Sequence, residues 1–177
     1  VTINIVDLLH SLAEVEIPEK VDYKLVADIT SSDETITLSS VEKLENSGYV
    51  LIGEEIVGYT AKNDTTNEIS GCTRGAFETK PSAHNTNDKV EKVRYYAPAN
   101  PFDILLEMLT MDAGISEDFI NLEEFAYWRD YPERDINFLG IITKPIKLSE
   151  LFFEVVDLLD AKAWIAEDWK ITIRKNL

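Results

Sequence analysis

Cys72, Arg74 and His84 are the side chains whose types and spacing come nearest to a nucleophilic site in this sequence. A thiol reacts as a thiolate, so it needs a neighbouring base or a cation that lowers its pKa, and arginine and histidine can serve. Cys72, however, occupies an apolar position in the predicted strand Glu68–Cys72, where cysteine usually behaves as a small hydrophobic residue. We therefore expect Cys72 to be buried and inert, and we predict no catalytic residue.

Pairs of acidic residues suggest glycoside hydrolysis, which needs two opposed carboxylates. Glu54–Glu55 and Glu123–Glu124 are the clearest pairs. Adjacent residues of a strand point to opposite faces, so the first pair cannot oppose each other. The chain holds 33 acids, which makes chance pairs common, and we expect these carboxylates to be solvated.

Metal and cofactor motifs are missing from the sequence. Its two histidines, His10 and His84, are far apart and fall on different predicted elements, which argues against a zinc site. The polar loop Asn63–Glu68 lacks the alternating acids and the glycine of an EF-hand, so an ordinary loop is favoured and weak Ca²⁺ binding is left open. No Walker loop, dinucleotide glycine motif, GxSxG or HExxH occurs, and we predict no cofactor.

The run Phe125–Tyr131, FAYWRDY, is rich in aromatic residues. Tryptophan, tyrosine and arginine carry much of the energy of protein interfaces, so Trp128, Arg129 and Tyr131 form a candidate partner surface. The alternative is that Phe125 and Trp128 pack in the core while Arg129 and Asp130 remain in water. Nothing in the residues themselves indicates an enzyme.

Composition limits the classes of partner. The 177 residues carry a net charge of −16, spread over both halves of the chain, which opposes binding to phosphate backbones. No apolar run is long enough to cross a bilayer, and Val1–Leu12 lacks the basic start of a signal peptide. A single cysteine excludes an internal disulfide. Because the first residue is valine, we expect a fragment of a longer chain.

Short apolar segments separated by turn residues predict a small antiparallel β module over residues 23–96. The expected strands are Lys24–Ile29, Glu34–Leu38, Tyr49–Ile52, Glu55–Thr60, Glu68–Cys72 and Lys89–Tyr96. The clearest hairpin turn is Ile52–Glu55, where Gly53 suits the first central position of a type II′ turn.

Residues 97–177 predict a helix-rich α+β module. Asn100 and Pro101 begin one helix, Asn121 and Glu124 resemble a capping box for a second, and Ser149–Asp160 carries a wide apolar face. A strand is expected at Asp135–Thr143. Lys162–Ala166 and Trp169–Arg174 predict a final β-hairpin, with Trp169, Ile171 and Ile173 on one face. The fold class is therefore α+β, with residues 1–22 as a strand–helix lead-in.

A longer pattern resembles a known family. It consists of an Ile-Gly-x-Glu-x-Ile-x-Tyr-Thr hairpin, a Gly-x-x-Arg-Gly turn, and Ala-x-x-His before a valine-rich strand. The matching residues are Ile52, Gly53, Glu55, Val57, Tyr59, Thr60, Gly71, Arg74, Gly75, Ala83, His84 and Val90. This looks like a β module of tail-tip and baseplate hub proteins of bacteriophages and prophages. NPFDILLEMLTMDAGISEDFIN, ITKPIKLSELFFEVVDLL and the ITIR strand resemble the same proteins in order, and VTINIVDLLHSLA resembles the end of a preceding hub domain.

The resemblance implies a virion structural protein at the tail tip, assembled in the bacterial cytoplasm and acting through contacts with other tail proteins and with itself. It implies that Gly53, Glu55, Tyr59, Arg74, Gly75 and His84 are a structural turn motif, with Arg74 pairing with an acid or a carbonyl. Two departures stand at Glu78 and Asn87, where the family often has glycine, so the loop between Phe77 and Asn87 is expected to take a different path.

Two functions follow as expectations. The first is a structural, non-enzymatic segment of a tail hub, whose isolated fragment is monomeric or weakly associating. The alternative is a module that binds a receptor or carbohydrate on the host surface through FAYWRDY. Neither involves nucleic acid or membrane insertion.

Overall fold

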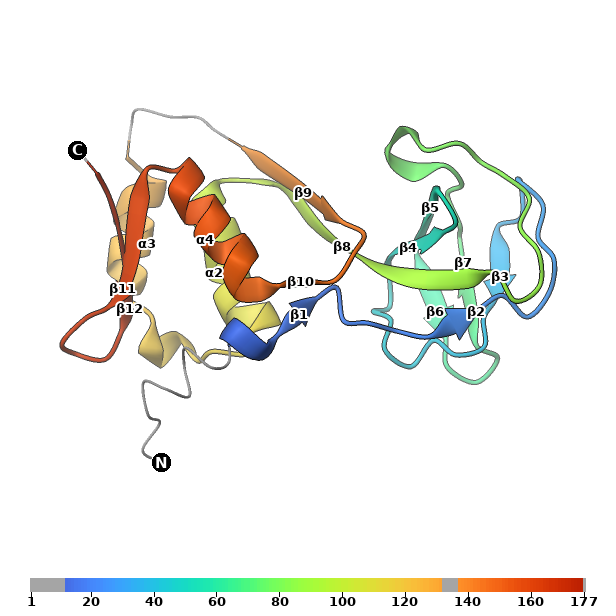
Figure 1. The fold of residues 1–177 in the computed structure, drawn as a ribbon, viewed down its shortest axis with the longest axis horizontal. Coiled ribbons are helices and arrows are strands. Elements are labelled where there is room, and N and C mark those ends of the chain that lie inside the picture. The colour runs from blue at the N-terminus through green and yellow to red at the C-terminus, as the bar shows by residue number, and fades with distance from the viewer. Residues whose placement is uncertain (1–11, 132–136, 177) are drawn as a thin grey trace. The chain divides into compact units, whose positions relative to one another are not determined.

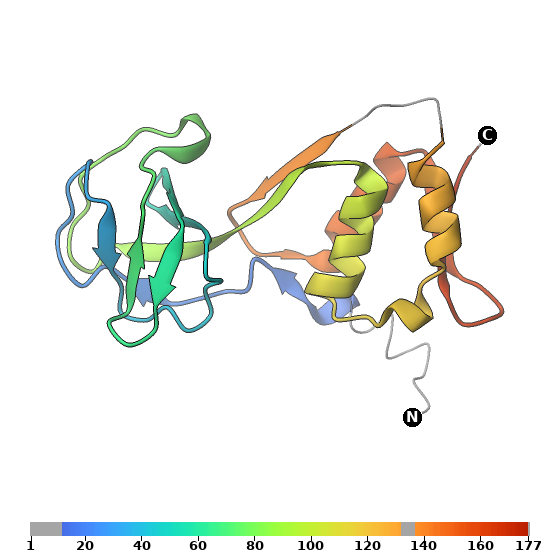
Figure 2. The same cartoon turned by 180° about the vertical axis from the view of Figure 1, so that it is seen from behind.

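The computed structural model describes residues 12–131 and 137–176. His10, and nearly all of the strand and helix expected in VTINIVDLLHSLA, lie outside the described residues. Contacts divide the chain into two compact units (Figures 1 and 2). Unit 1 comprises residues 1–17, 96–140 and 146–177, and unit 2 comprises residues 18–95 and 141–145. The fold is α+β and ends in a β-hairpin, as predicted.

Unit 2 begins before the strand that was expected to open it. Pro18 to Asp22 belong to it because Glu19 forms an ion pair with Lys43 and Val21 is buried in its core. The expected strand Lys24–Ile29 is mostly irregular: β2 spans Tyr23–Lys24, and isolated bridges join Leu25 to Leu38 and Ile29 to His84.

Unit 2 contains two antiparallel sheets, and the ends of two of their strands, residues 96–99 and 138–140, belong to unit 1. The strands of the larger sheet follow the order β2–β8–β4–β5, and β9 also pairs with β8. Their bounds are β8 (Lys89–Ala99), β4 (Gly48–Ile52), β5 (Glu55–Tyr59) and β9 (Phe138–Ile142). The smaller sheet contains β3 (Thr35–Thr37), β7 (Glu68–Ser70) and β6 (Ala61–Asn63). Strand β6 was not predicted.

Apolar side chains from several strands form the core of unit 2. Val50, Ile52, Val57, Ile69 and Val90 are fully enclosed, each contributing about 1.5–3 kcal/mol through burial. The β4–β5 hairpin closes at Ile52 opposite Glu55, and Gly53 has a φ of +61°. That value fits the predicted type II′ turn, in which a residue with a Cβ atom would be strained.

Unit 1 packs helices against a two-stranded sheet. Its helices are α2 (Pro101–Glu107), α3 (Leu122–Arg129) and α4 (Leu148–Leu158), with a π-helical turn η2 (Met108–Asp112) and a 3-10 turn η3 (Glu117–Phe119). The sheet pairs β11 (Ala161–Ile165) with β12 (Ile171–Lys175), and a second pair joins β1 (Glu16–Ile17) to β10 (Ile146–Lys147). Helix α4 contacts β11, and α3 contacts β12.

Helices α2 and α3 begin at the asparagine caps that the sequence predicts. The Asn100 side chain accepts a hydrogen bond from the Phe102 amide at 3.0 Å, and Asn121 accepts from the Glu124 amide at 3.2 Å. The capping box is only half formed, however. The Glu124 side chain instead accepts from Trp128 Nε1 at 3.1 Å and Arg174 Nε at 3.3 Å, which holds α3 against β12.

The expected position of Trp169 is wrong. Ile171 and Ile173 are buried as predicted, but Trp169 is 60% exposed and has a φ of +66°. The turn is longer than Glu167–Asp168 because the Trp169 amide donates to the Ala166 carbonyl and the Ala166 amide to the Lys170 carbonyl. Trp169 therefore lies in the turn and not in β12.

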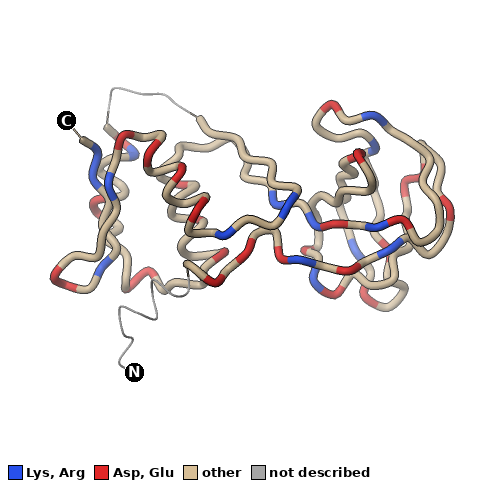
Figure 3. Tube along the Cα trace, viewed as in Figure 1, with Lys and Arg blue, Asp and Glu red and all other residues tan. Residues whose placement is uncertain are grey.

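Charged residues are distributed along both units, with acidic positions outnumbering basic ones (Figure 3). Among the described residues, no helix has the length and apolar character of a membrane span.

Candidate functional site

Glu55 lies at the start of β5 and is 1% exposed. It was expected to be solvated, and that expectation is wrong. Its neighbour Glu54 is exposed, so the two carboxylates do not share a site. A buried carboxylate requires compensating hydrogen bonds or charges, because burial in a low-dielectric interior is costly.

Arg74 supplies the first compensation. Its Nε donates to Glu55 Oε1 and its Nη2 to Glu55 Oε2, both at 2.8 Å, which is a bidentate pair. Arg74 also donates from Nη2 to the Ser82 carbonyl at 2.7 Å and from Nη1 to the Thr30 carbonyl. Arg74 thus contacts an acid and two carbonyls, the kinds of partner expected for it.

Three further donors complete the shell around Glu55. The Gly75 amide donates to Oε1 and the Ser82 amide to Oε2, both at 3.0 Å. His84 Nε2 lies 2.8 Å from Oε2, and it carries a proton because an ionised carboxylate only accepts. One carboxylate therefore joins β5 to the turn at Arg74 and to the segment that ends at His84. We call Glu55, Arg74, Gly75, Ser82 and His84 the Glu55 network.

The network fixes the protonation state of its acid. Burial by itself would raise the pKa of Glu55, but hydrogen bonds from Arg74, His84 and the Ser82 amide, together with the charge of Arg74, lower it to about 2. A carboxylate with this pKa and these partners is ionised and fully occupied at neutral pH. It is suited to holding loops together and unsuited to proton transfer.

Cys72 does not join Arg74 and His84 in a reactive site. Its Sγ donates to the Ile69 carbonyl at 3.7 Å, and burial raises the pKa of the thiol to about 11. A thiol with this pKa is protonated at neutral pH and is a poor nucleophile. Arg74 and His84 direct their polar atoms at Glu55 instead.

The two glycines of the motif, Gly75 and Gly53, lie close to other parts of the chain. Gly75 has a φ of +64°, and a Cβ atom there would lie 2.6 Å from both Pro81 Cδ and the Thr79 carbonyl. Gly53 lies beside the His84 ring, since an added Cβ would be 3.8 Å from His84 Cε1. Tyr59 lies outside the network: it is buried and its hydroxyl donates to the Glu45 carbonyl at 3.2 Å.

The expected departures from the family pattern have a structural counterpart. Glu78 has a φ of +64° and Asn87 a φ of +73°, the left-handed region that glycine favours. Both residues therefore hold a backbone conformation in which glycine would be unstrained.

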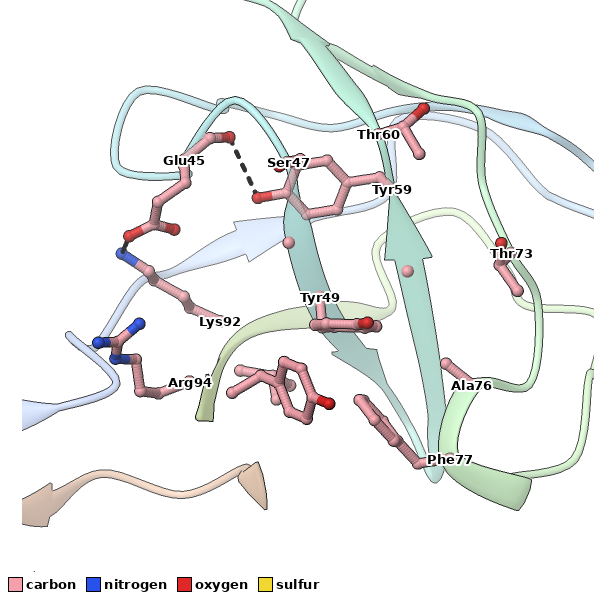
Figure 4. A pocket seen from close by; sticks show the side chains of 14 residues that line it. Glu45, Ser47, Tyr49, Tyr59, Thr60, Thr73, Ala76, Phe77, Lys92 and Arg94 are labelled. Carbon is pink, nitrogen blue, oxygen red and sulfur yellow. Dashed lines mark hydrogen bonds and ion pairs between the residues drawn. The ribbon is translucent and has the colours of Figure 1, made fainter. Parts of the chain in front are cut away.

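A groove in unit 2, with a volume of about 580 Å³, was not predicted (Figure 4). Four aromatic residues line it: Tyr49 on β4, Tyr59 on β5, Tyr95 on β8 and Phe77 in the 3-10 turn η1 (Ala76–Glu78). Tyr49 pairs with Val93, so Tyr95, two residues further on, shares its face of the sheet. Alternation could have revealed these two tyrosines, but nothing in the sequence indicates that Phe77 joins them.

The candidate partner surface is only partly exposed. Trp128 is 6% exposed and its indole donates to Glu124, so it cannot contact a partner in this fold. Arg129 is exposed and pairs with Asp130 at 2.8 Å and with Asp103 at 3.7 Å. Tyr131 is half-buried, and the most exposed aromatic residue of the run is Tyr127, at 58%. The geometry matches the alternative in which Trp128 packs in the core.

Within residues 12–131 and 137–176, no three His, Cys, Asp or Glu side chains are grouped so that they could hold a metal ion. In the loop Asn63–Glu68, Asn63 Oδ1 accepts from the amides of Thr65 and Thr66, and Thr66 donates to Glu68 at 2.6 Å. These contacts engage Asn63 Oδ1, the Thr66 hydroxyl and Glu68 Oε2 within the loop.

No protein-family model matches this chain, and no curated protein or solved structure shows detectable similarity to it.

Proposed function

We propose that this chain is a structural, non-enzymatic segment of a phage or prophage tail-tip or baseplate hub protein. Two lines support the proposal. The ordered sequence resemblance covers most of the chain, and the polar residues of its most distinctive motif serve architecture.

The Glu55 network is the observation that carries the proposal. Both carboxylate oxygens accept hydrogen bonds from Arg74 and from main-chain amides at 2.8–3.0 Å, and the carboxylate is almost completely buried. Catalytic acids, bases and nucleophiles need access to a substrate and a pKa near the working pH. The network has neither property, whereas it joins three chain segments that the sequence separates widely.

In this proposal the partners are other tail proteins and further copies of the parent chain, and the location is the virion tail tip. Such partners would act through surfaces shaped by a rigid β unit. A buried, fully hydrogen-bonded ionic group specifies one arrangement of the loops around it, which a repeated assembly requires.

The proposal is tested by locating the parent protein in phage particles. A short epitope would be inserted after Thr65, in the exposed turn between β6 and β7, within the complete parent protein. Particles released after prophage induction would be labelled with gold-conjugated antibody and imaged by electron microscopy, with untagged particles as the control. We expect label at the tail tip. Intact tails whose purified proteins lack the chain, as measured by mass spectrometry, would refute the proposal, and hydrolysis of peptidoglycan by the purified chain would refute its non-enzymatic part.

A further inference from the structure

Figure 4 shows the groove whose lining includes Tyr49, Phe77 and Tyr95, which we call the aromatic groove. It shares no lining residue with the Glu55 network. We propose that the aromatic groove binds a neutral oligosaccharide, with a sugar ring packed against these three side chains. This inference does not depend on the proposed place in a phage tail.

The three rings form one tilted apolar wall, with interplanar angles of 48° for Tyr49–Phe77, 71° for Tyr49–Tyr95 and 41° for Phe77–Tyr95, so a ligand can stack on one ring while it contacts the edges of the others. Their centroids are 4.7 Å apart for Tyr49–Phe77, 5.2 Å for Tyr49–Tyr95 and 5.0 Å for Phe77–Tyr95. At these distances the rings contact one another, so no space remains between them for a cation, as an aromatic cage would need. All three are half-buried, which leaves part of a continuous apolar surface open. The C–H face of a sugar ring suits such a surface.

The size and the rim of the groove suit a polyhydroxylated ligand. A volume of about 580 Å³ lies within the range of small-molecule sites. The rim includes the exposed hydroxyl residues Thr60 and Thr73. The Thr73 hydroxyl can donate and accept, whereas the Thr60 hydroxyl donates to the Ser70 carbonyl at 3.5 Å and offers its lone pairs as acceptors. Sugar hydroxyls need partners of both kinds.

Charge favours a neutral ligand. Lys92 at the rim is paired with Glu45 at 2.8 Å and donates to the Lys43 carbonyl at 2.9 Å, so its charge is already balanced. Arg94, the second base of the lining, is also engaged within the chain. The net charge of −16 opposes the approach of a polyanion.

Recognition of a peptide by strand addition is blocked. Strand β4 has β5 on one side and β8 on the other. The outward amides of Ile56 and Gly58 on β5, and that of Thr60 directly after it, donate to Thr79 Oγ1, the Thr73 carbonyl and the Ser70 carbonyl, each at 3.0 Å. An extended peptide would find no free main-chain donors here, although a polyproline segment, which docks on aromatic side chains alone, needs none.

Backbone strain supports a role for Phe77. Its φ of +54° is rare for a bulky residue, because the Cβ atom crowds the following carbonyl. Strain of this kind concentrates at binding and catalytic sites. Here the strained turn is what brings the Phe77 ring onto Tyr49 and Tyr95.

Binding is tested on the purified 177-residue chain with chitotetraose, cellotetraose, maltotetraose and decaproline as probes. Saturation-transfer difference NMR detects contact with ligand protons, and calorimetric titration gives Kd. We expect at least one saccharide to bind with its ring C–H protons most strongly saturated. If no saccharide binds, the proposal is wrong, and if only decaproline binds, the groove is a polyproline site instead.

Two variants locate the binding. Phe77→Ala removes one stacked ring and should weaken binding about tenfold. Thr73→Trp retains all three rings and the main-chain bonds to Gly58 while filling the groove, so it should abolish binding even if Phe77→Ala fails to fold. Tyr127→Ala removes an exposed aromatic residue of α3 and should leave Kd unchanged. Unchanged binding in Thr73→Trp, with circular dichroism showing a retained fold, would overturn the assignment.

Discussion

Replacing Glu55 by glutamine should strongly destabilise unit 2. The substitution preserves size but places an NH₂ group where only acceptors fit. Arg74 Nη2, the Ser82 amide and His84 Nε2 surround one carboxylate oxygen, and Arg74 Nε and the Gly75 amide surround the other. Either orientation of the amide therefore sets donors against donors, and the guanidinium loses its counter-charge.

The lowered pKa of Glu55 gives the magnitude of this destabilisation. A carboxyl group whose pKa falls from 4.5 to about 2 on folding contributes about 3 kcal/mol to the free energy of unfolding at neutral pH. Removing one partner of a buried ion pair costs about 3–5 kcal/mol, which agrees. Because the folded-state pKa is the lower one, this contribution is complete above pH 4.5 and declines as the pH falls toward 2. The difference in the free energy of unfolding between the original chain and Glu55→Gln should therefore become smaller as the pH falls from 4.5 toward 2.

Urea unfolding at pH 7 and at pH 3, followed by far-UV circular dichroism and by tryptophan fluorescence, measures both effects. All three tryptophans lie in unit 1, so their fluorescence should shift little while the circular dichroism transition of unit 2 moves to lower urea. Glu54→Gln, at the exposed neighbouring position, is the matched control and should change the unfolding free energy by less than about 0.5 kcal/mol. A loss below about 1 kcal/mol at pH 7, or an equal loss at both pH values, would refute the assignment of Glu55 as the ionised centre of the network.

Three other substitutions test separate parts of the structure. Gly75→Ala should lower the free energy of unfolding, measured with denaturant, more than Gly114→Ala does. Both residues have left-handed φ values, where a Cβ atom costs about 1 kcal/mol, but of the two only Gly75 also lacks space for that atom. Equal losses of stability would contradict the close contact with Pro81. Glu78→Gly should raise the unfolding free energy by up to about 1 kcal/mol because it relieves a left-handed conformation, and a decrease in stability would show that the Glu78 side chain contributes more than its backbone costs. Cys72 should resist alkylation by iodoacetamide at pH 8 until urea unfolds the chain, since burial raises the pKa of its thiol, and rapid labelling of the folded chain would contradict this. Cys72→Ser should lower the free energy of unfolding only modestly and leave assembly of the parent protein intact.

Local signals in the sequence were sufficient for much of the fold. The β4–β5 hairpin and its Gly53 turn, the Asn100 cap and the apolar face of α4 depend on neighbouring residues, and each was predicted from alternation, helical spacing or turn chemistry. The exposed Trp169 shows where such signals fail, because alternation cannot specify how many residues a turn takes.

The site depended on contacts between distant residues. Glu55, Arg74 and His84 could be named from the sequence, but their burial and mutual hydrogen bonds could not, because an acid at a strand start has the same local pattern whether it is solvated or enclosed. The Phe77 ring reaches Tyr49 and Tyr95 only through a strained turn that no propensity favours. The sequence thus determined the elements through short-range geometry, whereas the tertiary structure decided which polar groups are buried together and which aromatic rings meet at the groove.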